Sequence, residues 1–154
     1  MKNHKTKKVF NKRAVYDYFI EKKIESGMVL HGWEIKSIRS GKININNSYI
    51  FINKNEVFLI GSVIDPLSYI NDYKSCNTKR NRKLLLNKKE INFLRGYTNR
   101  SGYTLISISC YWKKSFYKLQ IGLAKSKQKK DKREQEKKHE WDLNKRRLMK
   151  NKIY

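Results

Sequence analysis

The sequence has little of what several classes of protein require. One proline and 7 glycines exclude a collagen-like or glycine-rich chain. No apolar run approaches the roughly 18 residues of a membrane span, and the basic stretch 1–10 lacks the apolar centre of a secretory signal, so we expect a cytoplasmic protein with no membrane contact. The two cysteines, Cys76 and Cys110, form no CxxC pair, which predicts free thiols in a reducing compartment.

Motifs of the common enzyme classes are absent as well. The chain has no GxxxxGK[ST] and no GxSxG, and His139-Glu140 does not extend to HExxH. A metal-dependent nuclease needs clustered carboxylates. The acids of the predicted folded region are scattered: Glu34, Glu56, Asp65 and Asp72. We therefore expect no catalysis, no cofactor and no metal.

Positive charge is what the chain has in excess. It carries 37 Lys and Arg against 13 Asp and Glu, a formal charge of +24 on 154 residues. Heavy use of Lys, Asn and Ile indicates a genome biased towards A+T, which accounts for some lysines but not for their clustering. A compact domain with this excess repels itself, and its natural partner is a polyanion such as RNA.

The composition changes after Leu123. Residues 124–154 contain thirteen Lys and Arg, five acids and few large apolar residues, too few to hold a helix in water. We predict a disordered basic arm at 1–10, a folded domain at 11–123, and a basic tail at 124–154 that is disordered when free. Acids interspersed in the tail favour i, i+4 ion pairs, so the tail should become helical on its target.

The periodicity predicts two or three helices. Asn11 can cap a helix that runs to about Ser26, and a short strand over Met28–His31 follows. Gly32–Lys42 is predicted as a helical turn or a short helix. Its side chains should divide into two sets, with Trp33 and Ile38 inward and Glu34, Lys36, Arg39 and Lys42 outward. A capping-box pattern at Asn87 starts another helix, which Gly96 should end.

Two pairs of strand-like runs predict hairpins. The first joins Ile45–Ile52 to Glu56–Ile60, with Asn residues taking the positive φ of the turn, and the second joins Tyr103–Trp112 to Phe116–Leu123. Tyr69–Lys83 should be a long exposed loop. About six strands without alternating helices predict a mainly β fold, an antiparallel barrel of the oligonucleotide-binding type.

The run 79–83 places four positive charges in five residues. Its Arg80 and Arg82 are predicted to clamp phosphates or stack on unpaired bases. The run leads into a helix N-terminus, itself an anion site, where Asn87 serves as a cap, a contact to RNA, or both.

Two acids and several aromatic residues each leave two interpretations open. Glu25 and Glu34 would accept hydrogen bonds from base amino groups or fix a neighbouring Arg, or else are ordinary helix-end charges. The aromatic residues of the second hairpin either pack or stack on bases: Tyr111, Trp112, Phe116 and Tyr117.

Several stretches together resemble the SmpB family of SsrA-binding proteins. They are GWEIKS (32–37) within residues 11–42, RKLLLN (82–87), YWKKSFYKLQIGLAKSK (111–127) and EWDLNKRRLMKN (140–151), in the family's order and spacing. The resemblance implies an oligonucleotide-binding barrel with a tail that is unstructured in isolation. It also implies that the protein binds the tRNA-like domain of transfer-messenger RNA and delivers that RNA to stalled ribosomes. In this complex the protein would stand in for the anticodon half of a tRNA, which the RNA lacks.

The resemblance also implies which residues bind RNA. Glu25, Leu85 and Asn87 carry over as contacts, and Trp33 supports the shape of the site. Charge adds further candidates: Lys36, Arg39, Arg80, Arg82, Lys83 and Lys125, with Glu34 beside them. The tail would lie in the decoding centre and message channel of the small subunit. Its candidate ribosome contacts are Lys130, Asp131, Lys132, Arg133, Trp141, Lys145, Leu148 and Met149.

The chain departs from the family pattern at Ser126, Lys130 and Glu136, where Gly, His and Ile are usual, which bears on the tail contacts rather than on the RNA site. Two other functions stay open: a ribosomal or general RNA-binding protein of barrel type, and an RNA-processing enzyme. We expect a monomer whose partners are transfer-messenger RNA and the ribosome.

Overall fold

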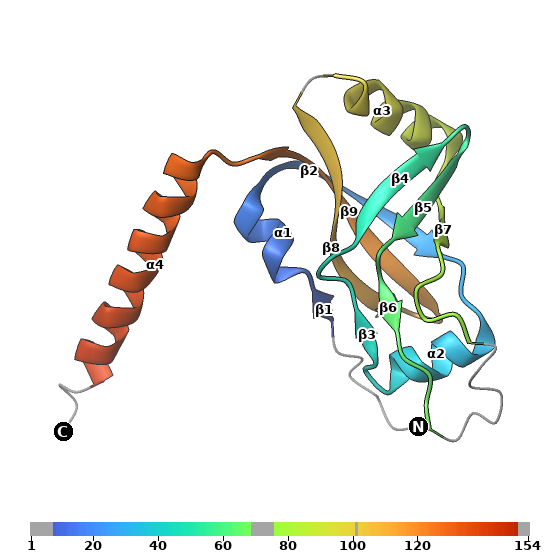
Figure 1. The fold of residues 1–154 in the computed structure, drawn as a ribbon, viewed down its shortest axis with the longest axis horizontal. Helices are drawn as coiled ribbons and strands as arrows, with labels where there is room; N and C mark the ends of the chain where they lie inside the picture. The colour runs from blue at the N-terminus through green and yellow to red at the C-terminus, as the bar shows by residue number, and fades with distance from the viewer. Residues whose placement is uncertain (1–7, 69–75, 101, 151–154) are drawn as a thin grey trace.

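The structure, a computed structural model, describes residues 8–68, 76–100 and 102–150 (Figure 1). The described residues form nine strands and four helices. The strands are β1 (Val9–Phe10), β2 (Tyr18–Met28), β3 (Ile43–Asn44), β4 (Tyr49–Asn53), β5 (Glu56–Ile60), β6 (Val63–Ile64), β7 (Arg82–Leu85), β8 (Tyr103–Lys113) and β9 (Phe116–Ser126). The helices are α1 (Lys12–Asp17), α2 (Gly32–Arg39), α3 (Lys88–Thr98) and α4 (Lys129–Lys150).

Six antiparallel strands close into a barrel. The order is β8-β4-β5-β7-β2-β9, and the β8–β9 pairing joins the two ends of this row. β1 adds an edge to β8, and β3 pairs with β6 in a separate two-stranded sheet. The predicted barrel is therefore confirmed, and the three short strands are additions to it.

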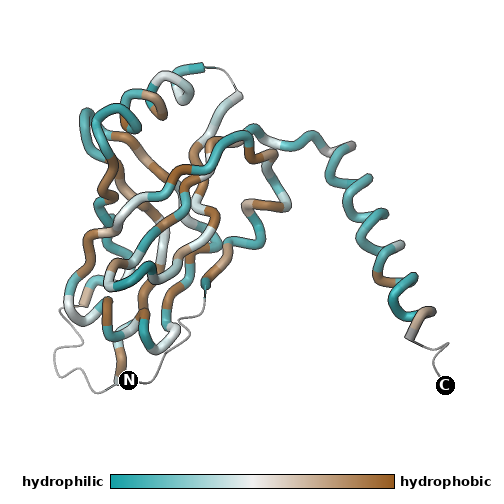
Figure 2. Tube along the Cα trace, turned by 180° about the vertical axis from the view of Figure 1, so that it is seen from behind, coloured by the Kyte–Doolittle hydropathy of each residue, from teal (hydrophilic) through white to brown (hydrophobic). Residues whose placement is uncertain are grey.

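The barrel encloses one main apolar core. Inward residues of neighbouring strands fill it, among them Leu59, Leu119 and Ile121, all fully buried. α3 and α2 lie at opposite ends of the barrel and contribute Leu94 and Ile38 to the core (Figure 1). Figure 2 shows the contrast with α4, which is mostly hydrophilic and projects away from the barrel.

The helix predicted over 11–26 is wrong beyond Asp17. Asn11 does cap α1, accepting a hydrogen bond from the Ala14 amide at 3.0 Å, but the chain then enters β2. The apolar residues Tyr16, Ile20 and Ile24 are spaced by four, which fits a helix and also fits the alternation of a strand. Pairing of β2 with β9 along its length decides between the two periods.

Other predicted boundaries shift in the same way. β2 ends at Met28, so the strand predicted over Met28–His31 does not extend through 29–31. α3 does not end at Gly96 but continues to Thr98. The end of the loop predicted over Tyr69–Lys83 belongs to β7, and residues 69–75 of that loop lie outside the described residues. β1 includes residues 9 and 10 of the predicted arm, whereas 1–7 also lie outside the described residues. The positive φ of the first hairpin turn, 51°, is at Lys54 rather than at an Asn.

Among the described helices, none combines the length and the apolar character of a membrane span.

Candidate nucleic-acid interface

Glu25 lies on β2 with its carboxylate held by three side chains of the β8–β9 hairpin. Tyr111 donates its hydroxyl to the carboxylate at 2.5 Å, and the Nζ of Lys113 lies 3.0 Å from it. Lys118 is 3.9 Å away. The hydrogen bond from Tyr111, with that from Lys113 and the charge of both lysines, lowers the pKa of Glu25. The same bond raises the pKa of Tyr111 to about 12. Glu25 is therefore a fixed, ionised acceptor, partly open to solvent.

Leu85 and Asn87 lie beside Glu25 because β7 pairs with β2. Leu85 is opposite Gly27, two residues along β2 from Glu25. It points outward, with 56% of its surface exposed. A Cβ on Gly27 would lie 3.4 Å from the Leu85 Cβ, an ordinary van der Waals contact, which shows how directly Leu85 lies against β2.

Asn87 is the exposed N-cap of α3, as predicted. The Asn87 amide donates to the Glu90 carboxylate at 2.8 Å, as part of a capping box. A groove of about 610 Å³ runs between β2 and the first turns of α3, and three lysines line it, Lys22, Lys23 and Lys89. We call these residues, together with Glu25, Leu85 and Asn87, the β2–α3 surface. It combines an acceptor, an apolar contact, an amide and positive charge.

Glu34 does not point outward as predicted. It is fully buried and accepts hydrogen bonds from Arg80 at 2.5 and 3.0 Å, from Arg82 at 2.9 Å and from the His31 amide at 2.8 Å. Burial raises the pKa of Glu34, but the hydrogen bonds from Arg80 and the His31 amide and the charges of both arginines outweigh it and lower the pKa overall. Glu34, Arg80 and Arg82 are hereafter the ion triad.

The predicted phosphate clamp at Arg82 is wrong for the same reason. Arg82 is 0% exposed and also donates to the carbonyl and hydroxyl of Ser62, each at 2.8 Å, and to the Thr78 carbonyl at 3.0 Å. Arg80 is mostly covered and donates to the Val29 carbonyl as well. The triad thus fixes β7 and the preceding turn against α2, and it positions the strand that carries Leu85.

The remaining RNA-binding candidates do not join the β2–α3 surface. Trp33, Lys36 and Arg39 lie on α2, at the opposite end of the barrel from α3 (Figure 1). Lys83 is exposed on β7 and pairs with Glu56. Lys125, on β9, lies 3.1 Å from Glu21.

Sequence reasoning missed the partners of Glu25. The sequence leaves packing and base stacking both open for Tyr111, whereas in the structure its hydroxyl positions the Glu25 carboxylate. Alternation at the end of β8 is the signal that could have found it: Cys110 lies in the core, and the strand period of two puts Tyr111 and Lys113 on the opposite, outer face.

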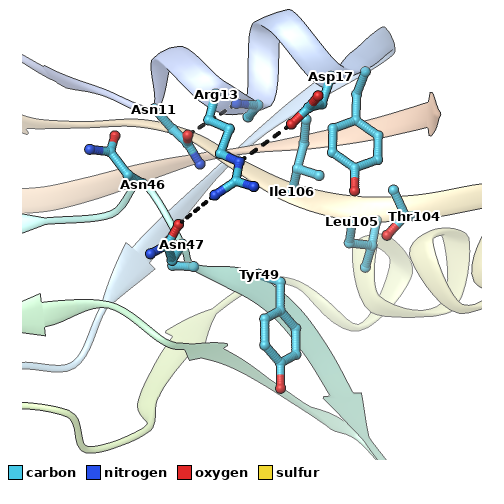
Figure 3. A pocket seen from close by; sticks show the side chains of 12 residues that line it. Asn11, Arg13, Asp17, Asn46, Asn47, Tyr49, Thr104, Leu105 and Ile106 are labelled. Atoms are coloured by element: carbon cyan, nitrogen blue, oxygen red, sulfur yellow. Dashed lines mark hydrogen bonds and ion pairs between the residues drawn. The ribbon is translucent and has the colours of Figure 1, made fainter. Parts of the chain in front are cut away.

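A second pocket, of about 300 Å³, lies between α1, β4 and β8 (Figure 3). Arg13 spans it, pairing with Asp17 at 3.6 Å and donating to Asn47 at 3.3 Å. Asn11 is buried beneath and donates to the Ile45 carbonyl at 3.1 Å. These contacts join α1 to the barrel, which is a structural role.

The tail helix α4 contacts the barrel domain through its first turns. Lys132 pairs with Asp17 at 2.6 Å, and Tyr16 donates its hydroxyl to Glu136. Asp131 accepts from the Gln128 amide at 3.2 Å. The hydrogen bond from Lys132 lowers the pKa of Asp17. Farther along, Trp141 is 62% exposed.

The other tail candidates are either exposed along α4 or have side chains outside the described ones. Arg133, Lys145 and Met149 are exposed, with Lys145 Nζ 5.0 Å from the centre of the Trp141 ring, while the side chains of Lys130 and Leu148 lie outside the described ones. That the tail is disordered in the free protein, and orders on the ribosome, stays a prediction.

The His, Cys, Asp and Glu side chains in the described part of the chain form no group of three or more that could hold a metal ion.

Comparison with known proteins gives one consistent result. SsrA-binding proteins of Buchnera aphidicola subsp. Acyrthosiphon pisum, from strains Tuc7, 5A and APS, are each 50% identical over 145 residues, which is 94% of this chain and 90% of the relative. A solved structure described as "tmRNA-SmpB: a journey to the center of the bacterial ribosome" matches with a TM-score of 0.66 and 33% identity, over 79% of this chain and 85% of the other. The family model "SmpB protein" matches residues 8–151. The chain therefore belongs to the SmpB family.

Proposed function

We propose that this protein is the RNA-binding adaptor of trans-translation, which binds the tRNA-like domain of transfer-messenger RNA and delivers it to stalled ribosomes. The observation that carries the proposal is the β2–α3 surface on a chain of charge +24 that belongs to the SmpB family. It is a binding protein rather than an enzyme and needs no cofactor. Its work at the ribosome places it in the cytoplasm, and one copy suffices to present the surface.

Each part of the β2–α3 surface has a separate role. The Glu25 carboxylate, kept ionised by Tyr111 and Lys113, accepts hydrogen bonds from base amino groups. Leu85 gives a flat apolar contact to a base or ribose. Asn87, at the start of α3, adds a donor and acceptor where the helix N-terminus favours phosphate. The groove lysines supply the salt-dependent part of the affinity.

The tail acts on the ribosome. α4 is a helix of 22 residues, about 33 Å long, with ten Lys and Arg against five Asp and Glu, and Trp141 exposed. A basic rod with an exposed aromatic residue suits a channel lined by RNA phosphates. Lys130, Asp131, Lys132, Arg133, Trp141, Lys145, Leu148 and Met149 are the proposed contacts in the decoding centre and message channel.

Replacing Glu25 with Ala should weaken binding to a transcript of the tRNA-like domain by about tenfold to a hundredfold, because a hydrogen bond to a charged group contributes about 1.5–3 kcal/mol. Titration of the labelled transcript at fixed salt measures this. Glu21→Ala is the matched control, since Glu21 lies on the same strand and also pairs with a lysine, Lys125, but outside the surface. Equal affinity of the Glu25 variant and the wild type would remove Glu25 from the site.

Sequencing of the RNA captured by the full-length protein separates the proposal from its competitors. One dominant tRNA-like species is expected. Ribosomal RNA alone would instead support a resident ribosomal protein, and shortened product would support a processing enzyme.

A further inference from the structure

A row of exposed aromatic side chains lies on the outer face of the barrel beside the β2–α3 surface. β4 contributes Tyr49 and Phe51, each 50% exposed, and β5 contributes the half-buried Phe58. These strands alternate, so that Ile50, Val57 and Leu59 fill the core while the aromatic residues point away from it. We call Tyr49, Phe51 and Phe58 the aromatic row.

The strand register makes the aromatic row continuous with Leu85. Phe51 is opposite Phe58, and Phe58 is opposite Lys83 on β7. Leu85 lies two residues farther along β7 on the same outer face. The barrel wall therefore presents rings, then a lysine, then the exposed leucine already assigned to the RNA-binding surface.

We infer that the aromatic row is a stacking platform for unpaired nucleotides of the RNA held by the β2–α3 surface. Exposed rings on a sheet bind single-stranded bases by stacking, and nearby cations bind the backbone. Tyr49 and Phe51 lie two residues apart on one strand, about 7 Å, so each ring is open to a separate base. This inference rests on the proposed function and extends its site.

Charge favours RNA over a protein partner for this platform. Lys83 lies within the row's register and pairs with Glu56, so these two charges cancel and leave no net negative charge beside the rings. At the tip of the β4–β5 hairpin lies Lys54, and Arg95 of α3 donates to Asn55 at 3.1 Å. Lys54 and Arg95 thus give the border of the rings a net positive charge, which attracts phosphate.

Phe51→Leu tests the platform, because leucine keeps the apolar area and removes the aromatic face. The probe is a transcript of the tRNA-like domain with its unpaired loops intact. Affinity should fall about tenfold, the effect of losing one stacked base, and Tyr49→Leu should act similarly. Phe19→Leu is the matched control: Phe19 is 52% exposed on β2, at the tail end of the barrel. Unchanged thermal unfolding shows that the variants fold.

Ultraviolet crosslinking of the wild-type complex gives a second readout that needs no variant. Crosslinked nucleotides should map to the peptide that contains residues 49–58. If wild type binds the transcript while both leucine variants bind equally well and no crosslink maps there, the platform is wrong and the proposed function stands. If the wild-type protein does not bind the transcript, both the platform and the proposed function are wrong. Normal RNA affinity with lost ribosome association would assign the row to another partner and overturn the inference.

Discussion

Glu34→Gln should lower the free energy of unfolding by about 3–5 kcal/mol, the cost of removing one partner from a buried ion pair. The substitution keeps the shape of the side chain but leaves Arg82, which is 0% exposed, with no carboxylate. Urea unfolding followed by circular dichroism measures the change. Because native domains are stable by only about 5–15 kcal/mol, the variant should be close to unfolding at physiological temperature.

Two variants test the physical reason for that loss. Glu56→Gln breaks an exposed pair with Lys83 and should cost less than about 1 kcal/mol. Combining Glu34→Gln with Arg82→Met removes both buried charges, so the double variant should be more stable than the sum of the single losses predicts. Additive losses would contradict a coupled triad.

The buried Glu34 carboxylate also makes the free energy of unfolding depend on pH, and the sign of this dependence can be derived. The pKa of Glu34 lies below its ordinary value of 4.5 in the folded protein. The stabilisation from its charge is therefore complete above that ordinary value and is lost as pH falls through the lower, folded pKa. The difference in stability between wild type and Glu34→Gln should shrink over this acid range and stay constant at neutral pH.

The barrel could be predicted from the sequence because its signals are local. The hairpins have alternating apolar residues and short polar turns, and the capping box at Asn87 can be identified from four consecutive residues. β2 could not be predicted, because spacing by four satisfies two periods and only pairing with β9 distinguishes them.

The candidate site likewise contains residues that could be predicted from the sequence and residues that could not. Family resemblance pointed to Glu25, Leu85 and Asn87, and the fold brings these three together. Arg80 and Arg82 look like free cations in a basic run, and their burial depends on Glu34, 46 and 48 residues away in sequence. No local pattern encodes a contact at that distance.

Truncation after Lys127 should abolish tagging of stalled nascent chains and leave RNA affinity within about twofold at physiological salt, where distant charges are screened. The cut falls after β9, which ends at Ser126, so the barrel keeps all its strands. The lost contacts, such as Lys132 with Asp17, are partly exposed and stabilise the domain little. A reconstituted translation reaction on a message without a stop codon, with transfer-messenger RNA present, measures the tagged product.

A tail of the same composition in scrambled order separates charge from shape. It restores the positive charge but moves Trp141 and the Asp131-Lys132-Arg133 start out of register with α1. If the tail works as a shaped helix, the scrambled chain should bind the transcript and still fail to tag. If it tags normally, charge alone fills the channel, and the contacts proposed along α4 are wrong. Full tagging by the truncated chain would show that the tail is not needed, because the barrel alone would then support tagging on the ribosome.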